Sequence, residues 1–250
     1  MELENYRTNA VGPARRFSEN RLLGALKPRD LELLVPHLEP VMLAPATVLF
    51  EPGEEVTHAH FPKPGTIGAI VITLNEGASA EAAMVGQEGA IGGIISQGDK
   101  PAFARGIVQI GGGAIRIDTE KLEAAKQRSA ALRDHFARYA DCLLAQVLQS
   151  VACNAVHDLD ARLARWLLTL QDRIESDELR ITQEFISQML GVHRPYTTRI
   201  IGDLEKRGAI EKTRGAVHVK DRKKLERNAC ECYGYLRRHF ERILPGVYPA

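Results

Sequence analysis

The sequence predicts an α+β protein: a β-rich roll near the N-terminus, a long central helix, and a winged helix-turn-helix near the C-terminus. Three observations predict this order. Short apolar runs separated by glycine- and proline-containing turns occupy residues 41–117. An unbroken helical periodicity covers residues 130–156. Two short helical patterns flank a glycine between residues 182 and 207, and a hairpin pattern follows them.

These patterns divide the chain into four parts. We predict the following boundaries: 20–125 for the roll, 126–157 for the long helix, 158–225 for the winged helix-turn-helix, and 226–250 for a helical extension.

Composition is that of an ordinary globular protein. Of the 250 residues, 44% are hydrophobic and 26% are charged, which is sufficient for a full core. No apolar run approaches the ~20 residues that a membrane span needs. Residues 1–20 also lack the apolar segment of a secretory signal. We therefore expect a cytoplasmic protein without a membrane partner.

The net charge of +1 conceals an uneven distribution. Residues 1–130 carry 13 basic and 16 acidic side chains, a net charge of −3. Residues 180–224 carry 11 basic and 5 acidic side chains, a net charge of +6. A basic block of this kind indicates a polyanion as its partner, and a solvated basic surface is the alternative.

Two short helices are predicted before the roll, near residues 20–26 and 28–38, the second with Pro28 in its first turn. Six short runs, with a spacing typical of a small antiparallel roll, are the expected strands: Thr47–Phe50, Ala59–Phe61, Ile67–Thr73, Ala80–Val85, Ile107–Ile110 and Ala114–Ile117. Asp118 or Thr119 is then placed to cap a helix. His58 and His60 share one face of a predicted strand, and we interpret them as a polar strand face rather than a metal or haem site.

The long helix, residues 130–156, carries an apolar seam with nearly heptad spacing. The seam residues are Leu132, Phe136, Tyr139, Leu143 and Val147, and Leu144, Leu148 and Val151 widen it. A seam of this kind favours a two-fold dimer contact. Packing of the helix on its own roll remains the alternative.

The next helix, over residues 158–174, places Trp166 on an apolar face, where we expect it in the core. The cysteines are Cys142, Cys153, Cys230 and Cys232. Their spacing matches neither a common zinc site nor a disulfide framework. We interpret them as reduced structural thiols and predict no metal ligands.

Residues 181–219 carry the functional motif. Thr182 is placed to cap a short helix, and Gly191 follows it at a position that favours a left-handed conformation. Pro195 falls in the first turn of a second helix, whose N-terminal half is polar and cationic. This pattern is typical of a DNA-reading helix-turn-helix, and residues 210–220 add a hairpin as the wing. A structural αα-hairpin with a solvated charged face is the alternative.

The candidate DNA contacts come from both helices and the wing. They are Thr182, Gln183, His193, Arg194, Tyr196, Thr197, Thr198, Arg199, Lys206 and Arg214.

Three segments, ARLARWLL (161–168), ITQEFISQMLGVHRPYTTRII (181–201) and LEKRGAIEKTRGAVHV (204–219), resemble the Crp/Fnr regulators in sequence and spacing. Residues 47–68 and 85–93 resemble the same family's β-roll. The resemblance implies a cyclic-nucleotide-binding-like roll, a dimerisation helix and a winged helix-turn-helix. Arg194 and Arg199 match the family's recognition-helix arginines, whereas Pro195 replaces its base-reading glutamate.

In the sensing half, the resemblance implies a degenerate nucleotide site. Glu88 and Arg105 stand roughly where nucleotide-binding members hold the cyclic phosphate, but the flanking residues differ. We therefore expect no certain cofactor and disfavour a cyclic nucleotide relative to another small effector or a signal carried by a protein. No cysteine precedes Cys142, so the N-terminal iron–sulfur cluster of some members has no ligands.

We therefore expect a transcription regulator that binds double-stranded DNA as a homodimer at a palindromic operator. RNA polymerase is a further expected partner. A small-molecule-binding module that acts on a protein partner without DNA is the alternative, but it leaves the basic block unexplained. No enzyme motif is present in the sequence, so we expect no catalytic residues.

Overall fold

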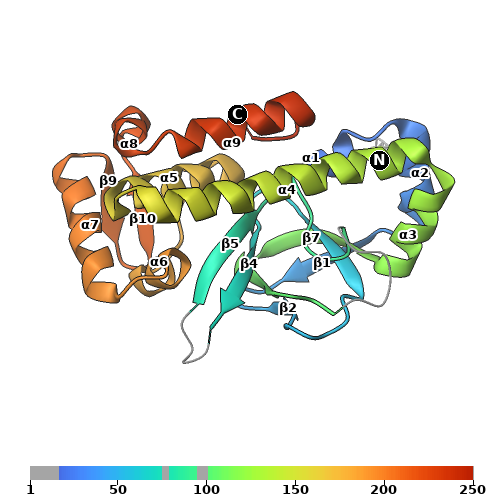
Figure 1. The fold of residues 1–250 in the computed structure, drawn as a ribbon, viewed down its shortest axis with the longest axis horizontal. Coiled ribbons are helices and arrows are strands. Elements are labelled where there is room, and N and C mark those ends of the chain that lie inside the picture. The colour runs from blue at the N-terminus through green and yellow to red at the C-terminus, as the bar shows by residue number, and fades with distance from the viewer. Residues whose placement is uncertain (1–16, 75–78, 95–100, 250) are drawn as a thin grey trace, which may run out of the picture.

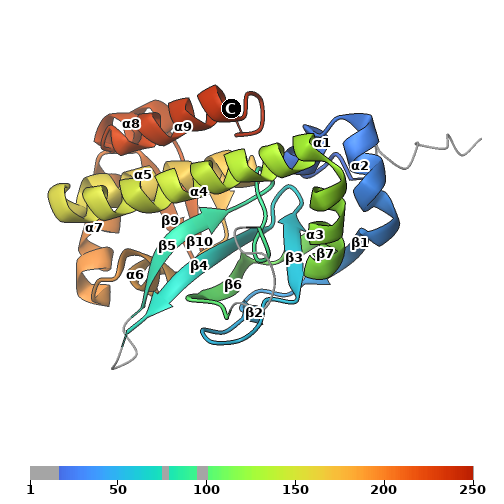
Figure 2. The same ribbon diagram turned by 45° about the vertical axis from the view of Figure 1, so that its right-hand side comes forward.

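A computed structural model of the chain describes residues 17–74, 79–94 and 101–249. Helix α4 (Ala130–Val156) runs along the long axis of the molecule (Figure 1). The sheets of the roll lie on one side of α4 and the last two helices, α8 (Arg222–Asn228) and α9 (Cys232–Ile243), on the other, as both orientations show (Figures 1 and 2). No helix among the described residues is long and apolar enough to cross a bilayer.

The N-terminal helices are α1 (Arg21–Gly24) and α2 (Pro28–Leu34), followed by a 3-10 turn, η2 (Val35–His37). Asn20 caps α1, because its side chain accepts a hydrogen bond from the Leu23 amide at 3.0 Å. Its amide nitrogen donates to the carbonyls of Pro62 and Gly89, both at 2.9 Å. One buried asparagine thus begins the helix and fixes it to the roll.

The roll consists of two antiparallel sheets. The first has the order β1 (Glu39–Leu43), β7 (Gly112–Asp118), β3 (His58–Pro62). The second has the order β2 (Val48–Phe50), β6 (Arg105–Ile110), β4 (Ile67–Thr73), β5 (Ser79–Val85). Each of the six predicted apolar runs forms a strand. Asp118 caps α3 (Thr119–Arg128), accepting from the amide of Glu120 at 2.9 Å.

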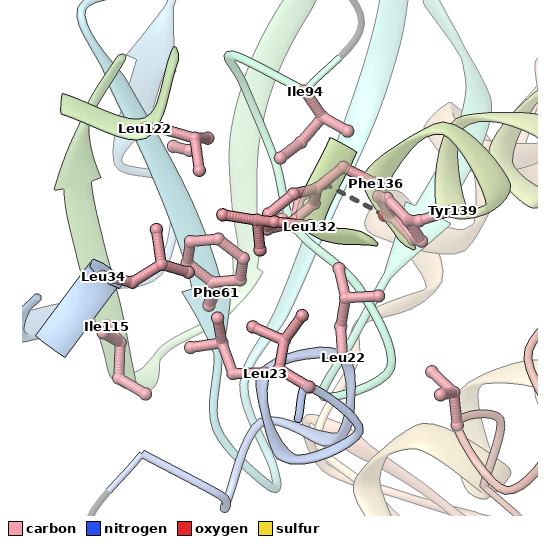
Figure 3. Packing of buried hydrophobic residues seen from close by; sticks show 14 of the residues in the cluster. Leu22, Leu23, Leu34, Phe61, Ile94, Ile115, Leu122, Leu132, Phe136 and Tyr139 are labelled. Carbon is pink, nitrogen blue, oxygen red and sulfur yellow. Dashed lines mark hydrogen bonds between the residues drawn. The ribbon is translucent and has the colours of Figure 1, made fainter. Parts of the chain in front are cut away.

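The predicted seam of α4 lies in the core of the chain itself. Leu132, Phe136 and Tyr139 point into a cluster that includes Leu22 of α1 and Phe61 of β3 (Figure 3). The three seam residues are at most 1% exposed, so they are not available to a second copy. Leu143, also in the predicted seam, packs against β5 instead, and Val147 packs on the same cluster. The structure therefore corrects the two-fold seam in favour of packing on the roll.

The C-terminal part begins with α5 (Leu159–Ile174), β8 (Glu178–Leu179), α6 (Gln183–Leu190) and α7 (Arg194–Lys206). It continues with β9 (Ile210–Thr213), β10 (Ala216–Val219), α8 (Arg222–Asn228) and α9 (Cys232–Ile243). The hairpin predicted as the wing is β9 and β10, and β8 pairs with β10 to complete a three-stranded sheet with the order β8-β10-β9. Trp166 of α5 is buried, as predicted, and its indole donates to Glu81 of β5 at 3.1 Å.

Candidate nucleic-acid interface

Local sequence determines the turn between α6 and α7. Thr182 caps α6 by accepting from the Phe185 amide at 3.1 Å. Gly191 ends α6 with φ 65°, a left-handed conformation that glycine adopts without strain. Pro195 lies in the first turn of α7, where a missing amide hydrogen removes no helical bond. The helix-turn-helix geometry predicted from sequence is therefore present.

The candidate contact residues differ in accessibility. The exposed ones are Thr182, His193, Arg194, Tyr196, Thr198, Arg199, Lys206 and Arg214, and Gln183 is half-buried. Thr197 is fully buried, and its hydroxyl accepts from Ser187 of α6 at 2.9 Å. Because Thr197 faces α6, it fixes the angle between the two helices rather than reaching DNA, which corrects its predicted role.

A groove of about 220 Å³ separates the start of α7 from the wing. Thr182 and Gln183 line it from α6, Arg194 from α7, and Lys212 from β9. Two cationic side chains from different elements thus border one groove. Sequence reasoning missed Lys212, although its place on the predicted wing beside Arg214 was an available signal.

Several cations on this face have no carboxylate partner. Among the described residues, no ion pair involves Arg194, Arg199 or Arg214. Farther along α7, by contrast, Lys206 lies 3.3 Å from Asp203. The Arg199 guanidinium lies 5.9 Å from the centroid of the Tyr196 ring, which leaves its N–H groups free to donate. Unpaired arginines of this kind suit phosphate oxygens and guanine edges.

The two sensor candidates lie apart and are already paired. Glu88 is 1% exposed and accepts from the Nε of Arg173 at 2.7 Å. Arg105 donates to Glu51 at 2.7 Å. Arg105 lies on β6, and Glu88 follows β5, whose last residue is Val85. Arg105 pairs with Val71 of β4, whereas Val85 pairs with Gly68 of β4, roughly 10 Å away along that strand. The fold therefore does not bring Glu88 and Arg105 into one pocket.

Arg173 was not predicted as an important residue. It lies on α5, is fully buried, and donates to Glu88, to the Tyr248 hydroxyl at 3.1 Å and to the Gln146 side chain of α4 at 3.1 Å. One guanidinium thus joins the roll, the long helix, the DNA-binding part and the C-terminus. A single arginine inside an amphipathic helix gives no sequence signal of such a role.

Comparison with known proteins agrees with this geometry. Residues 161–228 match the Crp-like helix-turn-helix domain. A protein of the Crp/Fnr family of transcriptional regulators from Eubacterium rectale has the same fold, with a TM-score of 0.64 and 20% identity over 88% of this chain and 99% of its own. FixK2 from Bradyrhizobium japonicum gives a TM-score of 0.67 at 12% identity, over 77% of this chain and 98% of its own.

The c-di-GMP responsive regulator CLP of Xanthomonas campestris gives a TM-score of 0.64 at 16% identity, over 78% of this chain and 100% of its own. These likenesses show a common fold, and the domain match adds the DNA-binding element. Residues 161–228 thus form a Crp-like helix-turn-helix domain, and the chain shares its fold with these Crp/Fnr-type regulators. No curated protein sequence matches this chain. Helices α6 and α7 and the hairpin β9–β10 all lie within the matched domain.

Proposed function

We propose that this protein is a DNA-binding transcription regulator that binds a palindromic operator as a homodimer, with α7 as the recognition helix inserted into the major groove of each half-site. The unpaired arginines at the start of α7 and on the wing are the observation that carries this proposal. Arg194 borders the groove between helix and wing, so it is placed to reach base edges while Arg214 and Lys212 meet the phosphate backbone.

A second face of α4 supports the homodimer. Leu144, Leu148 and Val151 are 55%, 60% and 64% exposed. Their spacing of four and three residues places them on one stripe of the helix, the arrangement that pairs two parallel helices. This stripe lies on a different face from the buried residues Leu132 and Phe136. We propose it as the dimer contact, in place of the seam predicted from sequence.

Contacts between the roll and the DNA-binding part support signal transfer. Glu81 on β5 accepts from Trp166 of α5, and Glu88 accepts from Arg173 of the same helix. A change of conformation in the roll would therefore move α5, the helix that precedes the helix-turn-helix in the chain. We propose that the effector is not a cyclic nucleotide bound by Glu88 and Arg105, because both side chains already pair with other residues of the protein.

The four free cysteines suit the reducing cytoplasm.

Selection of binding sites from random duplex DNA tests this proposal. We expect enriched sequences with two inverted half-sites whose centres are about 10 base pairs, one helical turn, apart or a multiple of that distance. Enrichment of a single, asymmetric half-site would contradict the homodimer but not DNA reading by α7. No enrichment at any salt concentration would contradict both, and would favour the alternative of a protein partner.

A further inference from the structure

Three cysteines and one histidine converge where α4 ends. Cys153 lies in the last turn of α4, and His157 is the residue that ends it. Cys230 lies in the connection from α8 to α9, and Cys232 lies at the start of α9. One ligand atom from each residue lies within 4.8 Å of the corresponding atom of every other. The three cysteines are at most 7% exposed.

The local structure explains how the two segments supply two ligands each. Cys153 and His157 are four residues apart, so they share one side of the helix end. The His157 amide donates to the Cys153 carbonyl at 3.0 Å, which keeps the histidine next to the last turn. Ala229 ends α8 in an extended conformation, and Cys232 is the first residue of α9. Glu231, the single residue between Cys230 and Cys232, has a helical backbone with φ −57° and ψ −17°.

Two of the distances between ligand atoms are close to those of a tetrahedron around one ion, and all of them are within 4.8 Å. With zinc–sulfur bonds of about 2.3 Å and zinc–nitrogen bonds of about 2.0 Å, tetrahedral ligands lie about 3.8 Å apart for sulfur and sulfur, and about 3.5 Å apart for sulfur and nitrogen. The sulfurs of Cys153 and Cys230 are 3.6 Å apart. The Cys232 sulfur is 3.5 Å from Nδ1 of His157.

We propose that Cys153, His157, Cys230 and Cys232 form a Cys3His site for one zinc ion. Four protein ligands leave no open coordination position, so the site is structural rather than catalytic. It connects the junction between α4 and α5 to the beginning of the C-terminal extension.

The surrounding residues suit such a site. Nε2 of His157 lies 3.3 Å from the Glu231 carboxylate, which orients Nδ1 toward the sulfurs. A carboxylate behind a metal-bound histidine is a frequent arrangement in zinc sites. The Gln149 side chain donates to the Cys232 sulfur at 3.0 Å. Three thiolates and one zinc ion carry a net charge of −1, which the nearby Arg162 and Arg165 of α5 offset.

Neither alternative accounts for all four groups. A disulfide needs sulfurs about 2.0 Å apart and uses only two of them, leaving the third thiol and the imidazole without a role. Thiols that serve only as small apolar groups do not need to converge on a histidine. The sequence prediction of structural thiols rested on a cysteine spacing that matches neither a common zinc site nor a disulfide framework. Here the ligand pairs are Cys-x3-His and Cys-x-Cys, from segments far apart in the chain.

Metal analysis and cobalt titration test the site. The full-length protein, purified without added metal, should contain one zinc ion per chain. After removal of zinc under reducing conditions, Co²⁺ should give the visible absorption bands of a tetrahedral ion and the near-ultraviolet band of thiolate ligation. Both should saturate at one equivalent, and added Zn²⁺ should abolish them.

Variants identify the ligands. His157→Gln and Cys232→Ser should each lose stoichiometric zinc and the tetrahedral cobalt spectrum. Glu231→Gln should keep the spectrum and bind roughly 10–100-fold more weakly, as expected for an outer-shell partner. Cys142→Ala is the matched control, because Cys142 lies in the separate core of the roll and should leave binding unchanged.

Two results on the wild-type protein would contradict the zinc site. Absence of zinc together with an octahedral cobalt spectrum in the wild-type protein would overturn the proposal. So would a Cys153–Cys230 disulfide in the freshly isolated protein, detected by mass spectrometry without reduction. Because the wild-type titration needs no substitution, a variant that fails to fold does not decide the question.

Discussion

At the scale of single residues, we expect Arg194 to read a base and Arg214 to contact the DNA backbone. Arg194 lies in the first turn of α7, and Arg214 is exposed on the wing turn. We predict that Arg194→Ala loses preference at one base pair of each half-site, about 1–3 kcal/mol of discrimination, with little change in the salt dependence. Arg214→Ala should weaken binding to all sequences alike and reduce the slope of log K against log salt by about one.

Site selection and anisotropy titrations at two salt concentrations measure both effects. Arg199→Ala provides a comparison within the same helix, because Arg199 lies about 140° around α7 from Arg194. If Arg194→Ala weakened every sequence equally and kept the wild-type motif, Arg194 would be a backbone contact. Pro195 has no side-chain donor, so we expect the base nearest to it to be weakly specified.

His60 shows how burial changes a residue that the sequence places on a polar strand face. It is 8% exposed, and burial, together with the charges of His58 and Arg116, lowers its pKa to about 4. The folded protein therefore keeps His60 neutral at a pH where the unfolded chain binds a proton. As pH falls from about 6.5 to 4, this difference should remove on the order of 3 kcal/mol from the free energy of unfolding.

Urea unfolding of the wild type and His60→Leu at several pH values measures this effect. The other titrating groups cancel in the difference between the two proteins. The unfolding free energy of His60→Leu, relative to wild type, should rise as pH falls through this range and level off near pH 4. Parallel curves of unfolding free energy against pH would show that His60 binds its proton equally in the folded and unfolded states.

At the scale of elements, the sequence predicts most boundaries but not which face meets which partner. The long helix was expected over residues 130–156 and forms over those residues. Its periodicity revealed a broad apolar surface without dividing it between the roll and a second subunit. Leu132, Phe136 and Tyr139 pack against the roll. The face that remains exposed belongs to the residues that only widened the predicted seam.

The exposed stripe gives a prediction about assembly. Leu148→Glu should shift the regulator from dimer to monomer without unfolding it, because Leu148 is 60% exposed in the single chain and two copies would bring like charges together. Sedimentation velocity with circular dichroism measures both properties. Met42→Glu is the control, since Met42 of β1 is 81% exposed and lies outside the stripe. A dimeric Leu148→Glu protein would place the contact elsewhere.

At the scale of the whole molecule, the contacts that join its parts were beyond sequence analysis. The Glu88–Arg173 pair connects residues 85 positions apart in the chain, and the cysteine–histidine cluster connects the end of α4 to the beginning of α9. Helical and strand periodicities report which side of an element is apolar. They carry no information about which buried polar groups meet across two elements, since that depends on the final packing.

The buried ion pair should be strongly coupled. Glu88→Ala leaves the guanidinium of Arg173 buried without its carboxylate, and should lower the free energy of unfolding by about 3–5 kcal/mol. Replacing both residues, with Glu88→Leu and Arg173→Met, should recover much of this loss. Urea unfolding of the single and double variants gives the coupling. Additive losses would show that the two side chains act independently.

The proposed zinc site predicts a joint effect on stability and DNA binding. Zinc that binds only the folded chain stabilises it by about 2.7 kcal/mol at a free concentration 100 times its Kd. For a domain of 150–250 residues, each kcal/mol shifts Tm by about 2–4 °C, so removal of zinc should lower Tm by roughly 5–10 °C.

Metal removal should also loosen the junction between α4 and α5, because His157 ends one helix and Asp158, the next residue, directly precedes the other. The two recognition helices of a dimer would then be held less firmly at the spacing of the half-sites, and ordering them on DNA would carry an entropic penalty. We therefore expect weaker binding to a two-half-site operator, with unchanged preference within each half-site and unchanged binding to a single half-site. Restored Zn²⁺, but not Mg²⁺, should recover both Tm and operator affinity, and Cys142→Ala should behave as the wild type. Equal losses on one and two half-sites would mean that the metal supports the fold of the DNA-binding part itself and not the junction.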